Sequence, residues 1–181
     1  KIDQKDVDLG WPDPAKIFLF ISTPSADLAS SLWSMDLKSK VLTPLVKDET
    51  GLVISWSKDG NQGLKFNNLK GMFRFSLIDN IGYELRAFSF ITLPEKCVLE
   101  KDKMFCGAPK FIRTGIILPD DYYKKAVYFQ DDIYSIDLAS GAASLLFNGD
   151  EKLIDAYHLA VKDNQLLFIN RYDNLLYSLQ L

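Results

Sequence analysis

Short stretches in which apolar and polar residues alternate run along the whole chain, and polar turns separate them. Residues 32–37 and 133–138 are clear examples. No apolar stripe with the helical period of 3.6 residues persists for the roughly 10–12 residues that a helix needs. The pattern therefore predicts short β-strands and an all-β fold.

One hexapeptide recurs along the chain. It reads Leu-Trp-Ser-Met-Asp-Leu from residue 32, Ile-Tyr-Ser-Ile-Asp-Leu from residue 133 and Leu-Tyr-Ser-Leu-Gln-Leu from residue 176, and a weaker copy, Met-Phe-Arg-Phe-Ser-Leu, begins at residue 72. A second element, a polar turn with an Asp, keeps step with it at Asp13, Asp59, Asp102 and Asp163. The unit of about 40–45 residues has the length of a β-propeller blade.

The repeat predicts about four antiparallel, four-stranded units, of which the last is incomplete. The units cover residues 7–48, 51–89, 90–149 and 153–181, with an insertion at residues 110–130. The last unit lacks its outer strand, which leaves two alternatives because the first and last blades must bury their faces. A strand around residues 1–7 completes a four-unit ring, or the chain is the C-terminal part of a larger propeller. We favour the second, because the chain begins with Lys1 rather than Met.

Two motifs resemble the PD40 type of WD40-like β-propeller, the blade type of TolB and of the propeller domains attached to prolyl oligopeptidases. They are Trp-Ser-Lys-Asp-Gly at residues 56–60 and Tyr-Ser-Ile-Asp-Leu-Ala-Ser-Gly at residues 134–141. The usual motif has Pro at the position of Lys58. The second half of the chain is also similar to uncharacterised propeller proteins of candidate-phylum bacteria, in residues 93–97, 106–109, 118–123 and 131–137. This second resemblance implies a membrane anchor upstream and supplies no catalytic residues.

Composition excludes several kinds of partner. The 21 Lys and Arg residues nearly balance the 24 Asp and Glu residues, and no block of like charges predicts a nucleic-acid or anionic-membrane partner. The longest apolar runs, such as residues 17–21, are too short to cross a bilayer. One His and two Cys do not readily complete a zinc site, so we expect no metal or cofactor.

Cys97 and Cys106 are the sharpest local feature of the sequence. They flank a predicted tight turn at Lys101 and Asp102 symmetrically. In a two-residue hairpin they form a non-hydrogen-bonded pair, whose Cα separation of about 4.5 Å suits a disulfide. We expect that bridge, and it indicates an oxidising compartment outside the cytoplasm, at the cell surface or in a periplasm-like space.

The insertion and the single His supply further candidates. Tyr122, Tyr123 and Lys124 have the composition of a binding hot spot and lie on a long loop, where binding residues concentrate. The alternative is a solvated loop in which one Asp caps a short helical turn. We expect His158, in a predicted strand, to be structural rather than a catalytic base.

Aromatic residues recur at set places in the units. Trp33, Phe73, Tyr134 and Tyr177 share one position of the hexapeptide, which favours a role in packing between blades. Trp11 and Trp56 lie on the first strands of their units, and we expect them to pack as well.

The leading functional hypothesis is a non-catalytic propeller that binds a protein or peptide outside the cytoplasm. One alternative is a propeller-type glycoside hydrolase or carbohydrate-binding propeller, with Asp8, Glu95 or Asp155 as carboxylates near the axis. Another is the propeller portion of a prolyl-oligopeptidase-like enzyme. The acids do not recur at a shared inner position and the chain shows no hydrolase motif, so we expect no enzymatic activity.

Overall fold

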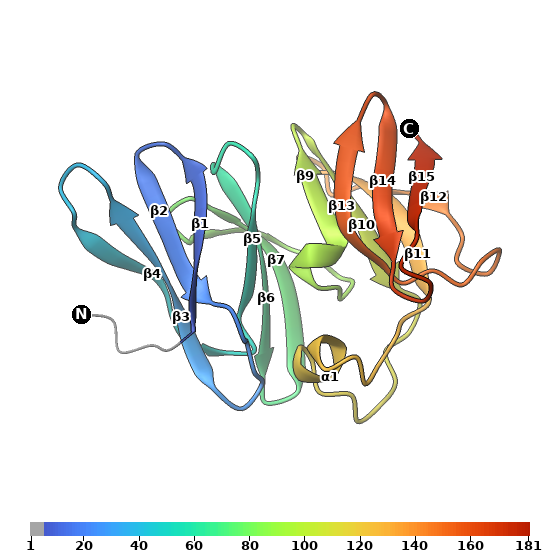
Figure 1. Ribbon diagram of the computed structural model, residues 1–181, viewed down its shortest axis with the longest axis horizontal. Coiled ribbons are helices and arrows are strands. Elements are labelled where there is room, and N and C mark those ends of the chain that lie inside the picture. The colour runs from blue at the N-terminus through green and yellow to red at the C-terminus, as the bar shows by residue number, and fades with distance from the viewer. Residues whose placement is uncertain (1–5) are drawn as a thin grey trace. The chain divides into compact units, whose positions relative to one another are not determined.

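The computed structural model describes residues 6–181, and they fold into four antiparallel sheets (Figure 1). The first sheet contains β1 (Val7–Asp13), β2 (Lys16–Ile21), β3 (Ala29–Asp36) and β4 (Leu42–Thr50). The second contains β5 (Val53–Trp56), β6 (Gln62–Leu69), β7 (Met72–Asp79) and β8 (Glu84–Ala87). The third contains β9 (Cys97–Glu100), β10 (Lys103–Pro109), β11 (Asp131–Asp137) and β12 (Ala143–Phe147), and the fourth β13 (Ala156–Lys162), β14 (Gln165–Asn170) and β15 (Leu176–Gln180).

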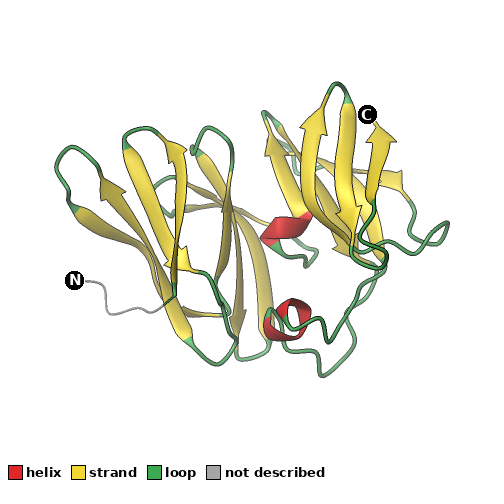
Figure 2. Cartoon of the chain, in the orientation of Figure 1, coloured by secondary structure: helices red, strands yellow, loops and turns green. Residues whose placement is uncertain are grey.

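Within each sheet, strands that follow one another along the chain are neighbours, so every sheet is a simple meander (Figure 2). Four-stranded meanders repeated along a chain are the blades of a β-propeller. The predicted all-β propeller fold is therefore confirmed. The first two blades, together with Ile117–Tyr123, form one compact unit, and the last two form a second with the remainder of the chain from Phe90 onward.

The fourth blade has three described strands, as the sequence predicts. The strand expected around residues 1–7 lies largely outside the described residues. Val7, which is described, begins β1 and pairs with Ile21 of β2 in the first blade.

The first strand of the third blade, β9, begins only at Cys97, although the third unit begins at residue 90. The residues before it form a single 3-10 turn, η1 (Pro94–Lys96), in which the backbone N–H of Lys96 donates to the carbonyl of Leu93 at 2.9 Å. Proline has no N–H for a sheet ladder and suits the first position of a helical turn. This turn leaves the Lys96 side chain fully buried.

The sheet register corrects the weaker copy of the repeat. Asp36, Asp79 and Asp137 each pair with the first residue of the preceding strand, so they occupy the same place in their blades. The copy in the second blade therefore begins at residue 75 rather than 72. The copies at residues 32 and 75, and those at 133 and 176, are then each 43 residues apart. Ser76, and not Phe73, is the counterpart of Trp33.

The Asp of the hexapeptide closes the turn after the third strand. One carboxylate oxygen of Asp36 accepts hydrogen bonds from the N–H and the hydroxyl of Ser39, both at 2.7 Å. Asp137 accepts the same pair from Ser140, at 2.7 and 2.6 Å. These bonds favour the charged carboxylate and lower the pKa of both Asp residues. The repeated motif is thus a turn motif, with no ligand implied.

Each unit has its own apolar core. In the first unit it contains Phe18, Leu32, Val46, Leu52, Ile54 and Ile78. Trp56 stacks on Phe18 with ring centroids 4.0 Å apart, which confirms its packing role. Trp11 is 65% exposed, so the same expectation is wrong for it. The β1–β2 register shifts between Gly10 and Asp13, and such a bulge changes the direction of the side chains within it.

The core of the second unit joins its two blades. It contains Phe105, Ile133, Ile154, Ala156, Leu159, Leu166 and Phe168, from both sheets. Tyr177 packs against it and stacks on Phe168 at 5.7 Å, as expected for an aromatic residue between blades. The loops at one end of these strands build the site described next.

Candidate functional site

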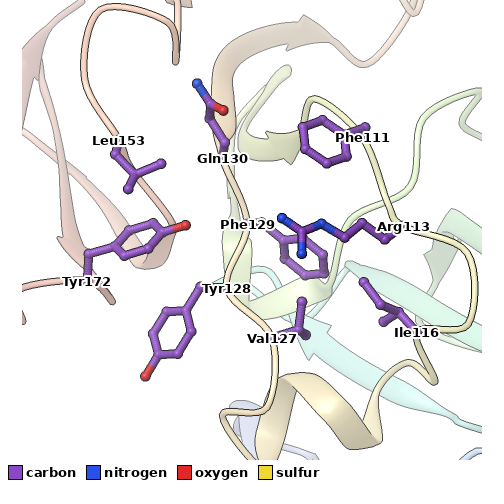
Figure 3. A pocket seen from close by; sticks show the side chains of 9 residues that line it. All are labelled: Phe111, Arg113, Ile116, Val127, Tyr128, Phe129, Gln130, Leu153 and Tyr172. Atoms are coloured by element: carbon purple, nitrogen blue, oxygen red, sulfur yellow. The ribbon is translucent and has the colours of Figure 1, made fainter.

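A pocket of about 140 Å³ lies among the loops of the second unit (Figure 3). It is lined by Phe111, Arg113, Ile116, Val127, Tyr128, Phe129, Gln130, Leu153 and Tyr172. The two ends of the insertion, after β10 and before β11, supply most of the wall. Leu153, before β13, and Tyr172, after β14, complete it.

The lining is mostly apolar and partly open to solvent. Phe129 is buried at 3% exposure, whereas Phe111, Tyr128 and Tyr172 expose 58%, 39% and 40% of their surface. The rings of Tyr128 and Tyr172 lie 5.3 Å apart, and the guanidinium carbon of Arg171 lies 4.7 Å from the Tyr128 ring centre. Exposed, mutually supported aromatic rings beside a cavity are typical of binding sites.

Tyr172 keeps its phenolic proton at neutral pH. Burial, with the charges of Asp155 and Asp131, raises the pKa of its hydroxyl, and Arg171 and Arg113 oppose that shift. Figure 3 shows the hydroxyl directed into the pocket. It is therefore available as a hydrogen-bond donor to a ligand.

A buried ion network lies directly behind the pocket. Lys96, Asp131 and Asp155 are fully buried, and Arg171 is 9% exposed. The ammonium of Lys96 contacts carboxylate oxygens of both Asp131, at 2.7 Å, and Asp155. Arg171 binds the second oxygen of Asp155 at 2.7 Å. Two cations and two anions balance, as buried charges require.

This network holds the pocket wall in place. The backbone N–H of Phe129 donates to Asp155 at 3.0 Å, and Arg171 donates to the carbonyl of Val127 at 3.3 Å. Both anchored residues line the pocket. The wall from residue 127 to residue 129 is thus positioned by ion pairs rather than by strand pairing.

Asp131 is the least satisfied member of the network. Its Oδ2 accepts from Lys96 and from the N–H of Ala156 at 2.8 Å, but its buried Oδ1 has no hydrogen-bond partner. Burial, reinforced by the charge of Asp155 and opposed by that of Lys96, raises the pKa of the Asp131 carboxyl to about 6. The bare Oδ1 is the position where a proton is best accommodated.

We expect the Asp131 carboxyl to stabilise the fold increasingly as the pH falls from about 6 toward its ordinary pKa of 3.8. A raised folded-state pKa means that the folded protein binds the proton more tightly than the unfolded chain. The free energy of unfolding, compared with Asp131→Asn, should rise by at most about 1.4 kcal/mol per pH unit in this window. Urea titrations of both proteins at several pH values measure it, and a constant difference would contradict it.

Arg113 is the one cation of the lining. It is exposed, and among the described residues no carboxylate lies within ion-pair distance of it. Figure 3 shows its guanidinium turned into the pocket, with Phe111 on one side and Ile116 on the other. The pocket therefore combines an apolar cavity with one uncompensated positive charge.

The structure separates the candidates of the insertion. Tyr122 lies in α1 (Asp120–Tyr123) and is only 2% exposed, so the expectation of an exposed contact residue is wrong for it. The segment is tied down because Asp120 accepts hydrogen bonds from Ser25 and Ala26 at 2.9 and 2.7 Å. Tyr123 and Lys124 are exposed, and their contact with a partner stays a prediction.

The other acid and base candidates lie in different surroundings. Asp155 belongs to the buried network, so it is not the open axial carboxylate that a glycosidase would use. Asp8 is exposed on β1, and Glu95 is half-buried in η1. His158 is exposed at a bulge of β13, where its φ of 52° is left-handed, and its ring lies 4.5 Å from that of Tyr157.

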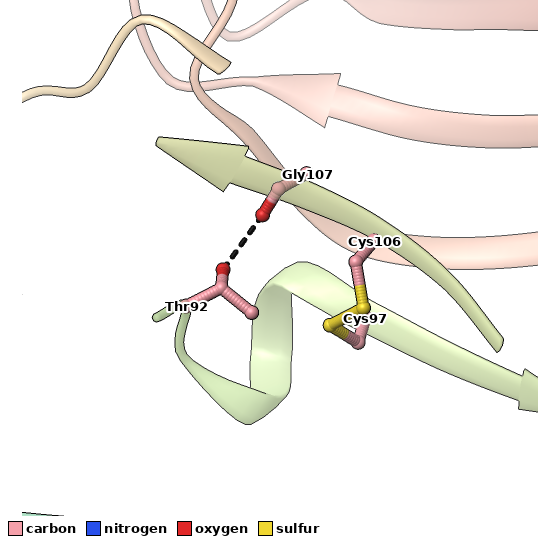
Figure 4. The surroundings of a disulfide bond; sticks show 4 residues. All are labelled: Thr92, Cys97, Cys106 and Gly107. Atoms are coloured by element: carbon pink, nitrogen blue, oxygen red, sulfur yellow. Dashed lines mark hydrogen bonds between the residues drawn. A yellow bond between two sulfur atoms is a disulfide. The ribbon is translucent and has the colours of Figure 1, made fainter. Parts of the chain in front are cut away.

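Cys97 and Cys106 form the expected disulfide (Figure 4). They pair directly across the β9–β10 hairpin with a Cα separation of 4.1 Å. Beside the bridge, the hydroxyl of Thr92 donates to the carbonyl of Gly107 at 2.6 Å. The prediction that the two Cys residues face each other across a tight hairpin is thereby confirmed.

Residues 6–181 contain no group of three His, Cys, Asp or Glu side chains placed to hold a metal ion. None of the helices described there is long and apolar enough to cross a membrane.

Comparison with known proteins gives a fold and no family. No family model and no curated protein matches the sequence. Solved structures match it at low identity. Acylaminoacyl peptidase of Pyrococcus horikoshii is 16% identical, with a TM-score of 0.56 over 92% of this chain and 28% of that one. The β-propeller domain of the Trilobed protease from Pyrococcus furiosus is 14% identical, with a TM-score of 0.56 over 96% and 53%.

TolB from Acinetobacter baumannii is similar in the same way. It is 15% identical, with a TM-score of 0.51 over 96% of this chain and 43% of TolB. The chain thus spans between 28% and 53% of these three proteins. The resemblance to TolB-type propellers is confirmed as a shared fold.

Sequence reasoning missed the residues that build the pocket. Lys96 and Asp131 lie in segments of the second resemblance, which assigns them no role, and Arg171 and Arg113 lie in no motif. The one available signal was Lys96, a charged residue shortly after the largely apolar residues 90–94.

Proposed function

We propose that the chain is a non-catalytic propeller platform that binds a protein or peptide outside the cytoplasm, through the pocket of its second unit. The observation that carries this proposal is the pocket itself, in which exposed aromatic rings and one unpaired Arg surround an apolar cavity. Tyr and Arg are the residues most enriched in protein-binding hot spots. The disulfide and the TolB-like fold support the extracytoplasmic location.

The chemistry of the lining favours binding over catalysis. The nine lining residues include no Asp, Glu, His, Ser or Cys. Asp131 and Asp155 lie behind the wall and are bound to Lys96 and Arg171, and Asp150, which contacts the lining residue Gln130, is paired with Lys110. General acid–base or nucleophilic catalysis needs such groups within reach of the substrate.

The size of the cavity favours a peptide over an oligosaccharide. Its volume of about 140 Å³ is close to that of an apolar cavity, about 150 Å³, that holds one benzene molecule. It therefore accommodates one ring or one branched side chain. A side chain projecting from a peptide meets this requirement.

We expect peptides selected from a random displayed library on the wild-type protein to lose about 30-fold in affinity for Tyr172→Ala, the effect of truncating a hot spot. Fluorescence anisotropy of the selected peptides measures this loss. Tyr83→Ala is the matched control, because Tyr83 is 68% exposed on the first unit and should leave the affinity unchanged. Equal losses for both variants, or a library from which no binding peptide can be selected, would contradict the proposal.

A further inference from the structure

We propose that this pocket recognises the C-terminal residue of a peptide, with an aromatic or branched side chain in the cavity and the terminal carboxylate on Arg113. The inference rests on the proposed peptide-binding function and specifies its ligand. Three observations carry it: the size of the cavity, the charge of Arg113, and the position of both in one pocket. A ligand must therefore present its side chain and its carboxylate close together.

The charge of Arg113 is not compensated within the site. The four charges of the buried network cancel one another, and no carboxylate of the described residues pairs with Arg113. Arg171, the other guanidinium near the pocket, is already bound to Asp155 and lies over the Tyr128 ring. The guanidinium of Arg113 therefore favours an anionic group on the ligand.

The chemistry of the donors points to a carboxylate. A guanidinium offers two parallel N–H groups that match the two oxygens of a carboxylate. Tyr172, which remains protonated and directs its hydroxyl into the pocket, can donate a hydrogen bond to another acceptor of the ligand. Phe129 is buried in the wall and Val127 is half-buried, and this apolar backing strengthens the bonds to the carboxylate.

The proximity of ring and charge selects a C-terminal residue over an internal acidic residue. The pocket takes one side chain, and Arg113 lines the same pocket. In a C-terminal residue the carboxylate is attached to the Cα that bears the side chain. In an extended peptide, the side chains of neighbouring residues point to opposite sides, so an internal Glu next to a Phe turns away from it.

Three short peptides test the inference on the full chain. One is acetyl-Ala-Ala-Phe with a free carboxylate, the second is its C-terminal amide, and the third is an amide that carries Glu immediately before Phe. Chemical shifts of the backbone amides of residues 111–116 and 127–130 report binding. We expect the free acid to bind about tenfold to a hundredfold more tightly than either amide, the range for one charge-assisted hydrogen bond.

Variants connect this preference to Arg113. Arg113→Gln should abolish the difference between acid and amide, whereas Arg86→Gln, on β8 of the first unit, should preserve it. Amides that bind as tightly as the acid, with affinity still lost in Tyr172→Ala, would overturn the carboxylate inference and leave the platform intact. If no probe shifts the pocket resonances, both proposals fail at this site.

Discussion

Replacing Lys96 with Met is expected to lower the free energy of unfolding of the second unit by about 3–5 kcal/mol, the cost of removing one partner from a buried ion pair. Met fills a similar volume but supplies no charge. Asp155 would then keep Arg171 as its partner, and Asp131, which is also fully buried, would lose its cation. The Lys96→Met chain must retain uncompensated charge in its interior or take up a proton there.

Hydrogen exchange of β9, β10 and β13 in urea is the measurement for this variant. Tryptophan fluorescence does not serve, because Trp11, Trp33 and Trp56 all belong to the first unit. Lys110→Met is the matched control, since Lys110 pairs with Asp150 at the surface and its loss should change stability little. Equal losses of unfolding free energy for the two substitutions would show that the buried network stabilises the unit no more than a surface ion pair does.

A second substitution separates charge from packing. Asp131→Asn, added to Lys96→Met, removes the unpaired anion and leaves the Asp155–Arg171 pair, which is neutral by itself. We expect the double variant to recover most of the lost stability, because the defect of the single variant is electrostatic. If the double variant is instead less stable than the single one, lost packing around residue 96 is the cause.

The apolar pattern and the turn residues predicted the strands well, because a short stretch of sequence is enough to determine each strand. Residues 143–147 are a short, mostly apolar stretch that follows a Ser-Gly turn, and they form β12. The weaker repeat was misplaced because β7 begins directly after the tight turn at Lys70 and Gly71, so its pattern starts three residues early. Only the pairing with β6 reveals which residue corresponds to Asp36.

The pocket and its network could not be predicted in this way. Lys96 and Arg171 both reach Asp155 only after two sheets have formed and the loops between them have closed. On the sequence alone, a Lys or an Asp reads as a solvated residue, because isolated charges are almost never buried. The prediction that Tyr122 is an exposed contact residue was wrong for a related reason. Its neighbour Leu118 is held by a hydrogen bond from Asn68, a residue far earlier in the chain.

The Cys97–Cys106 bridge closes a short loop within one hairpin, and breaking it is expected to lower the free energy of unfolding by about 3 kcal/mol. The bridge restricts the unfolded chain, so its loss raises the entropy of the unfolded state. Reducing the wild-type protein in denaturant and refolding it with reductant present breaks the bond. It changes the two side chains only by adding one hydrogen to each sulfur. Cys97→Ala with Cys106→Ala adds a small cavity to this effect, since Cys106 is fully buried.

Hydrogen exchange of β9 and β10 in urea measures the effect of the bridge. It should show a lower stability for the reduced wild type and a somewhat lower one still for the double variant. A reduced protein as stable as the oxidised one would mean that the bridge adds no stability, and thiols that alkylate without reductant would remove the argument for an oxidising compartment.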